Sequence, residues 1–170
     1  MLKYILIFFA FSVYLFIIIY LYYGFRYITK SWYSFNDIRK SSERLNINLY
    51  DLADIPEELK TKQFISIISN PTCSPCHKAV NEVIAYSLRK NVPSVCLLGL
   101  NEGKESKASK DFRDEFCGKI PIITIDLDQL IRSGFDSAPL YLIVDRNGFI
   151  LSMGADFVYI TNRWESQLIA

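Results

Sequence analysis

Two cysteines lie where an apolar segment gives way to a predicted helix. The segment Phe64–Ser69 is rich in isoleucine and has the length of a buried β-strand. The string Cys73-Ser74-Pro75-Cys76 follows this segment directly and opens the predicted helix. Two thiols separated by two residues can close into a disulfide or hold a metal ion. The chain must therefore build a fold in which a buried strand ends at a helix that begins with reactive groups.

The rest of the chain from about residue 45 alternates predicted strands with predicted helices. Besides Phe64–Ser69, the predicted strands are Asn46–Leu52, Val92–Leu100, Ile120–Ile125, Leu140–Val144 and Phe149–Met153. The predicted helices are a single turn at Ile55–Leu59, one from the cysteines to Asn91, Glu105–Phe116, Leu127–Arg132, and one that begins at Thr161 or Asn162 and runs to the end of the chain. This order predicts an α/β fold in which helices cover both faces of a sheet with parallel strands.

Two local patterns refine this prediction. Val80, Val83, Ile84 and Leu88 recur at helical spacing, so we expect them to share one buried face of the helix that follows the cysteines. Between the last two predicted strands, Asn147-Gly148 is a strong signal for a β-hairpin.

The start of the chain has a different character. From Tyr4 to Tyr23 there are 20 residues without a charged side chain, enough for a helix that crosses a hydrocarbon core of about 30 Å. The run ends in Leu21-Tyr22-Tyr23-Gly24-Phe25, which is too bulky for the small-residue cleavage site of a signal peptide. A buried core helix rarely stays apolar on every face for this length. We therefore predict a single transmembrane anchor at residues 1–24 within the lipid bilayer, a juxtamembrane linker at 25–44 and a globular domain at 45–170.

Two features of the sequence give opposite indications of the side of the membrane on which the domain lies. Lys3 precedes the apolar run, while Arg26, Lys30, Arg39 and Lys40 follow it, and the positive-inside rule would place these four in the cytoplasm. Disulfide chemistry, by contrast, is concentrated outside the cytoplasm. We expect a single-pass protein of the cell membrane with its domain on the extracytoplasmic side. The formal net charge of +1 and the absence of a long single-sign run give no reason to expect a nucleic-acid partner.

The position of the cysteines at a helix start predicts their chemical roles. Free backbone N–H groups and the helix dipole stabilise negative charge there, which favours the Cys73 thiolate as an attacking nucleophile. Cys76, one turn further on, could then resolve a mixed disulfide. Pro75 suits the first helical turn, where no backbone donor is needed. The alternative is a pair of inert packing cysteines.

The order of strand, Cys-x-Pro-Cys, helix and a later strand introduced by Ala138-Pro139 resembles the thioredoxin fold over residues 45–170. With the anchor, the string Leu140–Gly148 is similar to the membrane-anchored thiol–disulfide oxidoreductases of the TlpA group. The string Asn70–Cys76 looks like the variant in methylamine-dehydrogenase maturation proteins. The resemblance implies a central mixed sheet flanked by helices, no bound cofactor, client proteins with thiols or disulfides, and a redox partner protein.

The resemblance also assigns a role to Pro139. It implies a cis-proline that faces the two cysteines and presents the Ala138 backbone to an extended client peptide. An ordinary proline at the start of a strand is the alternative. The chain departs from thioredoxins proper at Thr72, where they have tryptophan, and in Phe64–Ser69, which lacks their buried acid. Thr72, Pro75 and His77 are candidates for tuning the two thiols.

Other readings of the same residues remain. With His77, the string becomes Cys-x-x-Cys-His, the attachment pattern of a c-type haem. The second axial ligand is often methionine, but the chain has only Met1 and Met153, and Met153 lies in a predicted hairpin, so this interpretation is less favoured. Zinc is less favoured, because Cys96 and Cys117 form no second close pair, and we expect no metal. Cys96 is predicted to be a buried apolar residue and Cys117 to be more exposed, with a disulfide between them left open. A non-catalytic assembly factor with dispensable cysteines is a further alternative.

Overall fold

The computed structural model describes residues 46–167 of the chain; the predicted anchor at 1–24 and linker at 25–44 lie outside the described residues. Within 46–167, no helix has the length and apolar character needed to cross a membrane. The strands are β1 (Phe64–Ser69), β2 (Ser94–Leu100), β3 (Ile122–Asp126), β4 (Leu140–Val144) and β5 (Ile150–Gly154). The α-helices are α2 (Glu57–Lys60), α3 (Ser74–Lys90), α4 (Lys107–Phe116), α5 (Leu127–Arg132) and α6 (Phe157–Gln167), with short 3-10 helices η1 (Leu49–Asp51) and η2 (Asn101–Gly103).

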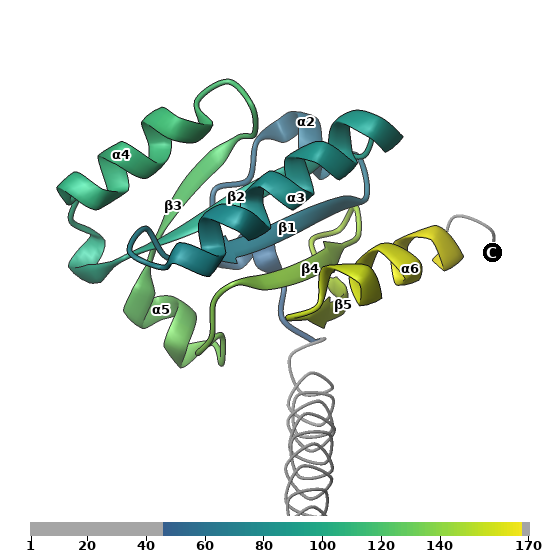
Figure 1. Cartoon of the computed structure of the whole chain (residues 1–170). Helices are drawn as coiled ribbons and strands as arrows, with labels where there is room; N and C mark the ends of the chain where they lie inside the picture. Colours follow the sequence, from purple (N-terminus) through teal and green to yellow (C-terminus); the bar gives the residue numbers. More distant parts are fainter. Residues whose placement is uncertain (1–45, 168–170) are drawn as a thin grey trace, which may run out of the picture. The chain divides into compact units, whose positions relative to one another are not determined.

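One mixed sheet organises the domain (Figure 1). Its strand order is β3-β2-β1-β4-β5. β1 pairs in parallel with β2, and β2 in parallel with β3, while β4 runs antiparallel to both β1 and β5. This confirms the predicted α/β class and the mixed sheet. It also places β1 at the centre of the sheet, where both of its faces are covered.

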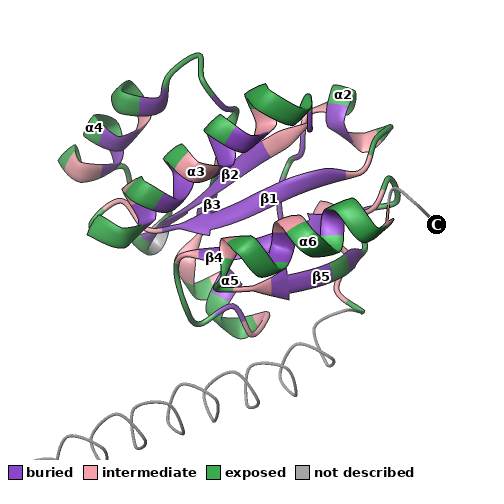
Figure 2. Cartoon of the chain, turned by 45° about the vertical axis from the view of Figure 1, so that its right-hand side comes forward, coloured by how far each residue is buried: buried purple, intermediate pink, exposed green. Residues whose placement is uncertain are grey.

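Each face of the sheet has its own apolar core. One core, which we call the α3 face, includes residues of β1, β2 and β4 together with α3, α4 and α6. The other, the α5 face, is built by η1, α2 and α5 on the opposite side of the same strands. All six residues of β1 are buried, and Figure 2 shows this continuous burial along the strand. A strand buried on both faces needs no alternation of polar and apolar residues, which explains the near-continuous isoleucine run.

Three predicted elements differ from the structure. The predicted strand Asn46–Leu52 is wrong: Asn48 makes an isolated bridge to Phe149, and its side chain then accepts a hydrogen bond from the Tyr50 amide at 2.9 Å. This local bond favours the 3-10 turn η1 over an extended strand. The last helix begins at Phe157, before the predicted start, because the Asp156 carboxylate accepts the Val158 amide at 2.8 Å and caps the helix.

The third difference concerns the buried face of α3. The sequence pattern predicts that Leu88 shares the buried face, but 79% of its surface is exposed. The buried face is centred on Cys76, Val80 and Val83, and Ile84 lies at its edge. At about 100° per residue, Leu88 lies about 120° around the helix from Cys76, which turns it away from the sheet. A spacing of four residues alone did not reveal this drift.

The predicted hairpin between β4 and β5 is confirmed. The Gly148 amide donates to the Asp145 carbonyl at 3.0 Å, and the Asp145 carboxylate accepts the amides of Asn147 and Phe149, each at 2.8 Å. Gly148 has φ +89°, and a Cβ there would clash with the Asn48 side chain, so this turn needs glycine on both counts.

Candidate active site

The turn between β1 and α3 is closed by Asn70. Its side-chain oxygen accepts the Thr72 amide at 2.9 Å and the Thr72 hydroxyl at 2.8 Å. Its backbone carbonyl accepts the Cys73 amide at 3.1 Å. Asparagine commonly bonds its own backbone two residues on, and this arrangement folds the chain sharply after the strand. Asn70 is not among the predicted site residues, although Asn-Pro is a recognised turn signal.

The two cysteines occupy the start of α3, as predicted. Cys73 is the residue before the first helical turn, with φ −92° and ψ 105°, and its side chain makes no capping hydrogen bond. The Cys76 amide donates to the Cys73 carbonyl at 3.0 Å. Pro75 lies in the first turn, where its missing N–H leaves no helical hydrogen bond unmade. The sulfur of Cys73 therefore lies at the positive end of a helix of 17 residues.

Cys73 and Cys76 are joined as a disulfide, with their Cα atoms 5.3 Å apart. The two residues differ in access. Cys73 is half-buried, whereas Cys76 is completely buried. Attack along the S–S axis requires the incoming thiolate to reach a sulfur atom from outside. An external thiol can therefore reach the disulfide through Cys73 and not through Cys76.

Ala138 and Pro139 lie next to Cys73, although they are far from it in sequence. The Sγ atom of Cys73 is 3.8 Å from the Ala138 carbonyl oxygen. The Ala138–Pro139 peptide bond is cis, Ala138 is exposed and Pro139 is half-buried at the entrance to β4. The structure thus brings both predicted substrate-binding residues to the dithiol.

His77, a candidate for tuning the two thiols, directly follows Cys76 in the first turn of α3. Its Nδ1 atom lies 2.7 Å from Glu115 Oε2 on α4, with both side chains partly exposed. Its ring meets Phe112 edge-on at a centroid distance of 4.9 Å. Glu115 was missed because it lies on another helix, and no spacing pattern connects the two positions. The contact ties the first turn of α3 to the last turn of α4.

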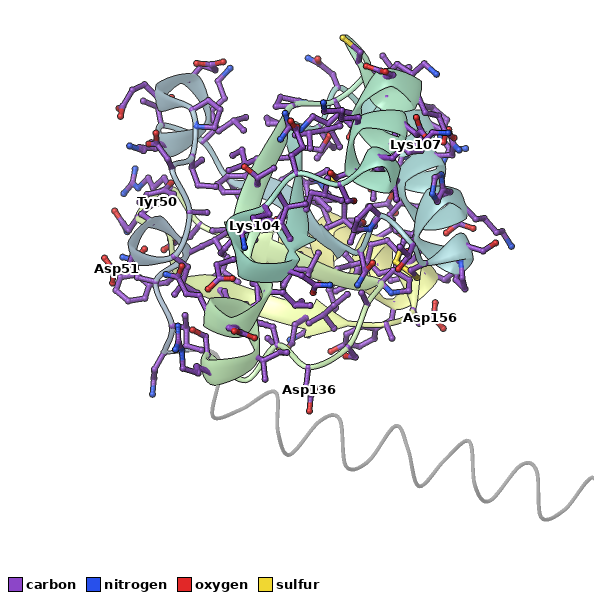
Figure 3. The ribbon with its side chains drawn as sticks, turned by 90° about the vertical axis from the view of Figure 1, so that its left-hand side faces the viewer. Tyr50, Asp51, Lys104, Lys107, Asp136 and Asp156 are labelled. Carbon is purple, nitrogen blue, oxygen red and sulfur yellow. A yellow bond between two sulfur atoms is a disulfide. The ribbon has the colours of Figure 1, made fainter. Side chains whose placement is uncertain are left out.

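A small pocket of about 80 Å³ lies beside the Asn70 turn at the carboxyl ends of β1 and β2. It is lined by Asn70, Pro71, Thr72, Gly99, Leu100, Asn101, Lys104 and Ser106. Figure 3 shows Lys104 at this end of the domain and Asp136, two residues before Ala138, projecting away from the ribbon. Lys104 thus contributes a positively charged side chain to the lining of this pocket.

The other two cysteines are both free and have contrasting surroundings. Cys96 is completely buried within β2, as predicted. Its burial raises the pKa of the thiol to about 12, and the neighbouring Ser69 hydroxyl offsets part of that rise. Cys117 is exposed at the end of α4, so the disulfide left open by the sequence is not formed.

Within the described residues, Met153 is not placed to serve with His77 as an axial ligand of a c-type haem. Met153 is buried in the core of the α5 face, whereas Cys73, Cys76 and His77 lie on or next to α3, which covers the other face. The sheet therefore separates Met153 from the Cys-x-x-Cys-His string. Within residues 46–167, no three His, Cys, Asp or Glu side chains gather as metal ligands.

No protein-family model matches the sequence, and no curated protein matches it. Solved structures do match its fold. A thiol–disulfide oxidoreductase from Bacteroides fragilis is 13% identical, with a TM-score of 0.53 over 66% of this chain and 85% of that one. DsbF of MTB, in its mixed oxidised and reduced forms, is 19% identical, with a TM-score of 0.51 over 65% and 84%.

A third similar structure is the thioredoxin domain of a thiol–disulfide oxidoreductase from Bacteroides vulgatus. It is 17% identical, with a TM-score of 0.51 over 64% of this chain and 81% of that one. At such identities the similarity establishes the fold and leaves the activity to the site. The chain therefore has a thioredoxin-like fold, with a Cys73-x-x-Cys76 disulfide where its central strand meets its longest described helix.

Proposed function

We propose that this chain is a membrane-anchored thiol–disulfide oxidoreductase that exchanges disulfides with client proteins. One observation carries the proposal: a half-buried Cys73 at the start of α3 is bonded to a completely buried Cys76. This asymmetry gives each sulfur a distinct role. An external thiolate can attack Cys73. Cys76 can leave as a thiolate and can attack again only the sulfur of Cys73 beside it.

The exchange proceeds in two steps. A client thiolate attacks Cys73 Sγ, a client–Cys73 bond forms, and the Cys73–Cys76 bond breaks with Cys76 leaving as a thiolate. A second client thiolate then attacks the client sulfur of this mixed disulfide and releases Cys73. Two electrons pass from the client dithiol, which becomes a disulfide, to the protein, which becomes a dithiol. The same steps in reverse reduce a client disulfide.

The helix start and the Ala138 loop assist these steps. Released thiolates carry negative charge, which the first-turn amides and dipole of α3 stabilise. The exposed backbone of Ala138 lies within 3.8 Å of Cys73 Sγ, so an extended client segment placed along it would bring its sulfur to Cys73. We assign substrate binding to Ala138 and Pro139 on this basis.

The proposal extends to the part of the chain outside the described residues. The uncharged run from Tyr4 to Tyr23 supports a single transmembrane anchor in the lipid bilayer. The proposed disulfide chemistry supports an extracytoplasmic domain, where thiols are not kept reduced. There the protein would help exported proteins to mature, and a redox partner protein would restore its dithiol or its disulfide after each cycle.

The test uses the full chain solubilised in detergent. Reduction of insulin disulfides by dithiothreitol is followed with the wild type, with Cys73→Ser and with Cys117→Ser as a matched control at an exposed cysteine. We expect acceleration by the wild type and Cys117→Ser, and none by Cys73→Ser. If Cys73→Ser keeps full function in the cell, the proposal is wrong and a non-catalytic assembly factor is favoured.

A further inference from the structure

Strand β1 contains two buried hydroxyl groups without partners. Ser66 is completely buried and Ser69 is 1% exposed, and neither Oγ atom makes a hydrogen bond to any residue of 46–167. They are the polar side chains of a strand that is otherwise apolar. Buried polar groups are nearly always hydrogen-bonded, so each unpaired hydroxyl calls for an explanation.

The two serines point to opposite faces of the sheet. Ser69 alternates with Ile65 and Ile67, which belong to the core of the α3 face. Ser66 alternates with Phe64 and Ile68, which belong to the core of the α5 face. Ser69 therefore lies under the helix that carries the cysteines, and Ser66 lies on the far side of the sheet.

Cys76 faces Ser69's side of the sheet from α3, the helix that covers it. On α3, Cys76, Val80 and Val83 recur at spacings of four and three, and the two valines pack in the core of the α3 face. Cys76 is thus on the side of the helix that faces the sheet, and it is completely buried. It is the first inward-facing residue of α3, just as Ser69 is the last residue of β1.

The turn between the two elements is short and tightly bonded. The Asn70 carbonyl accepts the Cys73 amide, and the Cys73 carbonyl accepts the Cys76 amide, at 3.1 and 3.0 Å. The chain therefore folds back at once from the end of β1 into the first turn of α3. This geometry brings the Ser69 hydroxyl and Cys76 to the same end of the layer between helix and sheet.

We propose that Ser69 is a positioning residue for Cys76, whose sulfur accepts a hydrogen bond from the Ser69 hydroxyl when the disulfide is reduced. The inference rests on the proposed function and deepens it. In the disulfide form the Ser69 hydroxyl makes no well-formed hydrogen bond, and the Cys76 sulfur is bonded to Cys73. On reduction, the thiolate or thiol of Cys76 becomes a better acceptor, and bonds to charged sulfur are the stronger kind. Ser69 therefore favours the reduced form.

Cys96 is the competing partner for this hydroxyl. Its thiol lies close enough to the Ser69 hydroxyl for a hydrogen-bonding contribution that lowers the Cys96 pKa, although no well-formed hydrogen bond joins the two groups in the disulfide form. Cys96 is also completely buried and is not one of the two cysteines of the disulfide. If Ser69 acted through Cys96, its effect would disappear once Cys96 was replaced.

The experiment compares full-length wild type, Ser69→Ala and Ser66→Ala in glutathione redox buffers. The fraction of Cys73–Cys76 dithiol is measured by alkylation and mass spectrometry. Ser66→Ala is a matched control, because it removes an equally buried and unpaired hydroxyl from the same strand. We expect Ser69→Ala to shift the equilibrium constant about tenfold toward the disulfide, as for the loss of a hydrogen bond to a charged group. Ser66→Ala should stay within about twofold of the wild type.

Other outcomes would contradict the inference separately from the proposed function. A wild type that equilibrates with glutathione, together with equal constants for Ser69→Ala and Ser66→Ala, would overturn the role of Ser69 alone. A wild type that never forms the dithiol would overturn the proposed function and this inference with it. The shift caused by Ser69→Ala should persist in a Cys96→Ala background, and its loss there would assign Ser69 to Cys96 instead.

Discussion

The start of α3 and the middle of β2 both carry cysteine, in opposite surroundings. Cys73 lies at the end of a helix, half-buried and next to an exposed backbone segment. Cys96 lies in a strand between two others, completely buried, and its burial raises the pKa of its thiol to about 12. The comparison teaches that the fold decides the chemistry of a thiol. A helix start stabilises its negative charge, and a sheet interior suppresses that charge.

The largest expected effect is in alkylation of the native, reduced full chain by iodoacetamide. At about pH 8, a thiol with the Cys96 pKa is ionised in only about one molecule in 10,000, and the reagent cannot reach it. We expect Cys96 to react at least about 1,000-fold more slowly than Cys73. Peptide mass spectrometry over time measures both rates, with exposed Cys117 as an internal control. Similar alkylation rates for Cys96 and Cys73 would contradict the claim that burial in β2 suppresses the reactivity of the Cys96 thiol.

Much of this contrast could be predicted from the sequence, because it depends on local patterns. The isoleucine run gave β1, Pro75 suited the first turn of α3, and Asn147-Gly148 marked the hairpin. The contact between Glu115 and His77 and the position of Ser69 on the sheet face covered by α3 could not be predicted. Both depend on which helix packs on which face of the sheet, and this is a tertiary property that no spacing along the chain contains.

A second prediction concerns the core that holds the site. Phe112 is completely buried, contacts the His77 ring and lies 4.8 Å from the Phe116 ring. Phe112→Ala should lower the free energy of unfolding by about 3–5 kcal/mol, because it leaves a cavity under α4. Leu88→Ala is the control, since a side chain that is 79% exposed should cost less than about 0.5 kcal/mol. Urea unfolding measures both, and equal losses would show that the α3 face is not packed as described.

A third prediction follows from the pH dependence of Cys96. In the unfolded chain its thiol ionises above its ordinary pKa of 9.0, while in the folded chain the pKa is raised to about 12. The buried thiol thus contributes stability below about pH 9 that is lost as the pH rises toward 12, by at most about 1.4 kcal/mol per pH unit. Burial also raises the pKa of the Tyr141 hydroxyl, which acts in the same direction.

The measurement is urea unfolding of the reduced full chain at several pH values from about 8 to 11. Cys96→Ala should lose less stability over this range than the wild type, and Tyr141 should account for part of the remaining slope. Identical slopes for the two proteins would mean that Cys96 is not held in its thiol form by burial.

The smallest expected effect is at the contact between α3 and α4. His77 and Glu115 are both partly exposed, so solvent weakens their interaction. Glu115→Gln should lower the free energy of unfolding by about 0.5 kcal/mol. It should leave the alkylation of Cys96 unchanged, because it does not open the core. A loss as large as that of Phe112→Ala would show that this pair, rather than the aromatic packing, holds the first turn of α3.

The central claim is that Cys73 is attacked and Cys76 resolves, and trapping tests it most directly. The full-length Cys76→Ala variant is expressed in the cell that naturally makes the protein. Its covalent complexes are then separated by gel electrophoresis with and without reductant. We predict conjugates to other proteins that pass through Cys73, dissolve with reductant and are missing from the Cys73→Ala/Cys76→Ala double variant. No conjugates at all, or the same conjugates in the double variant, would contradict the account.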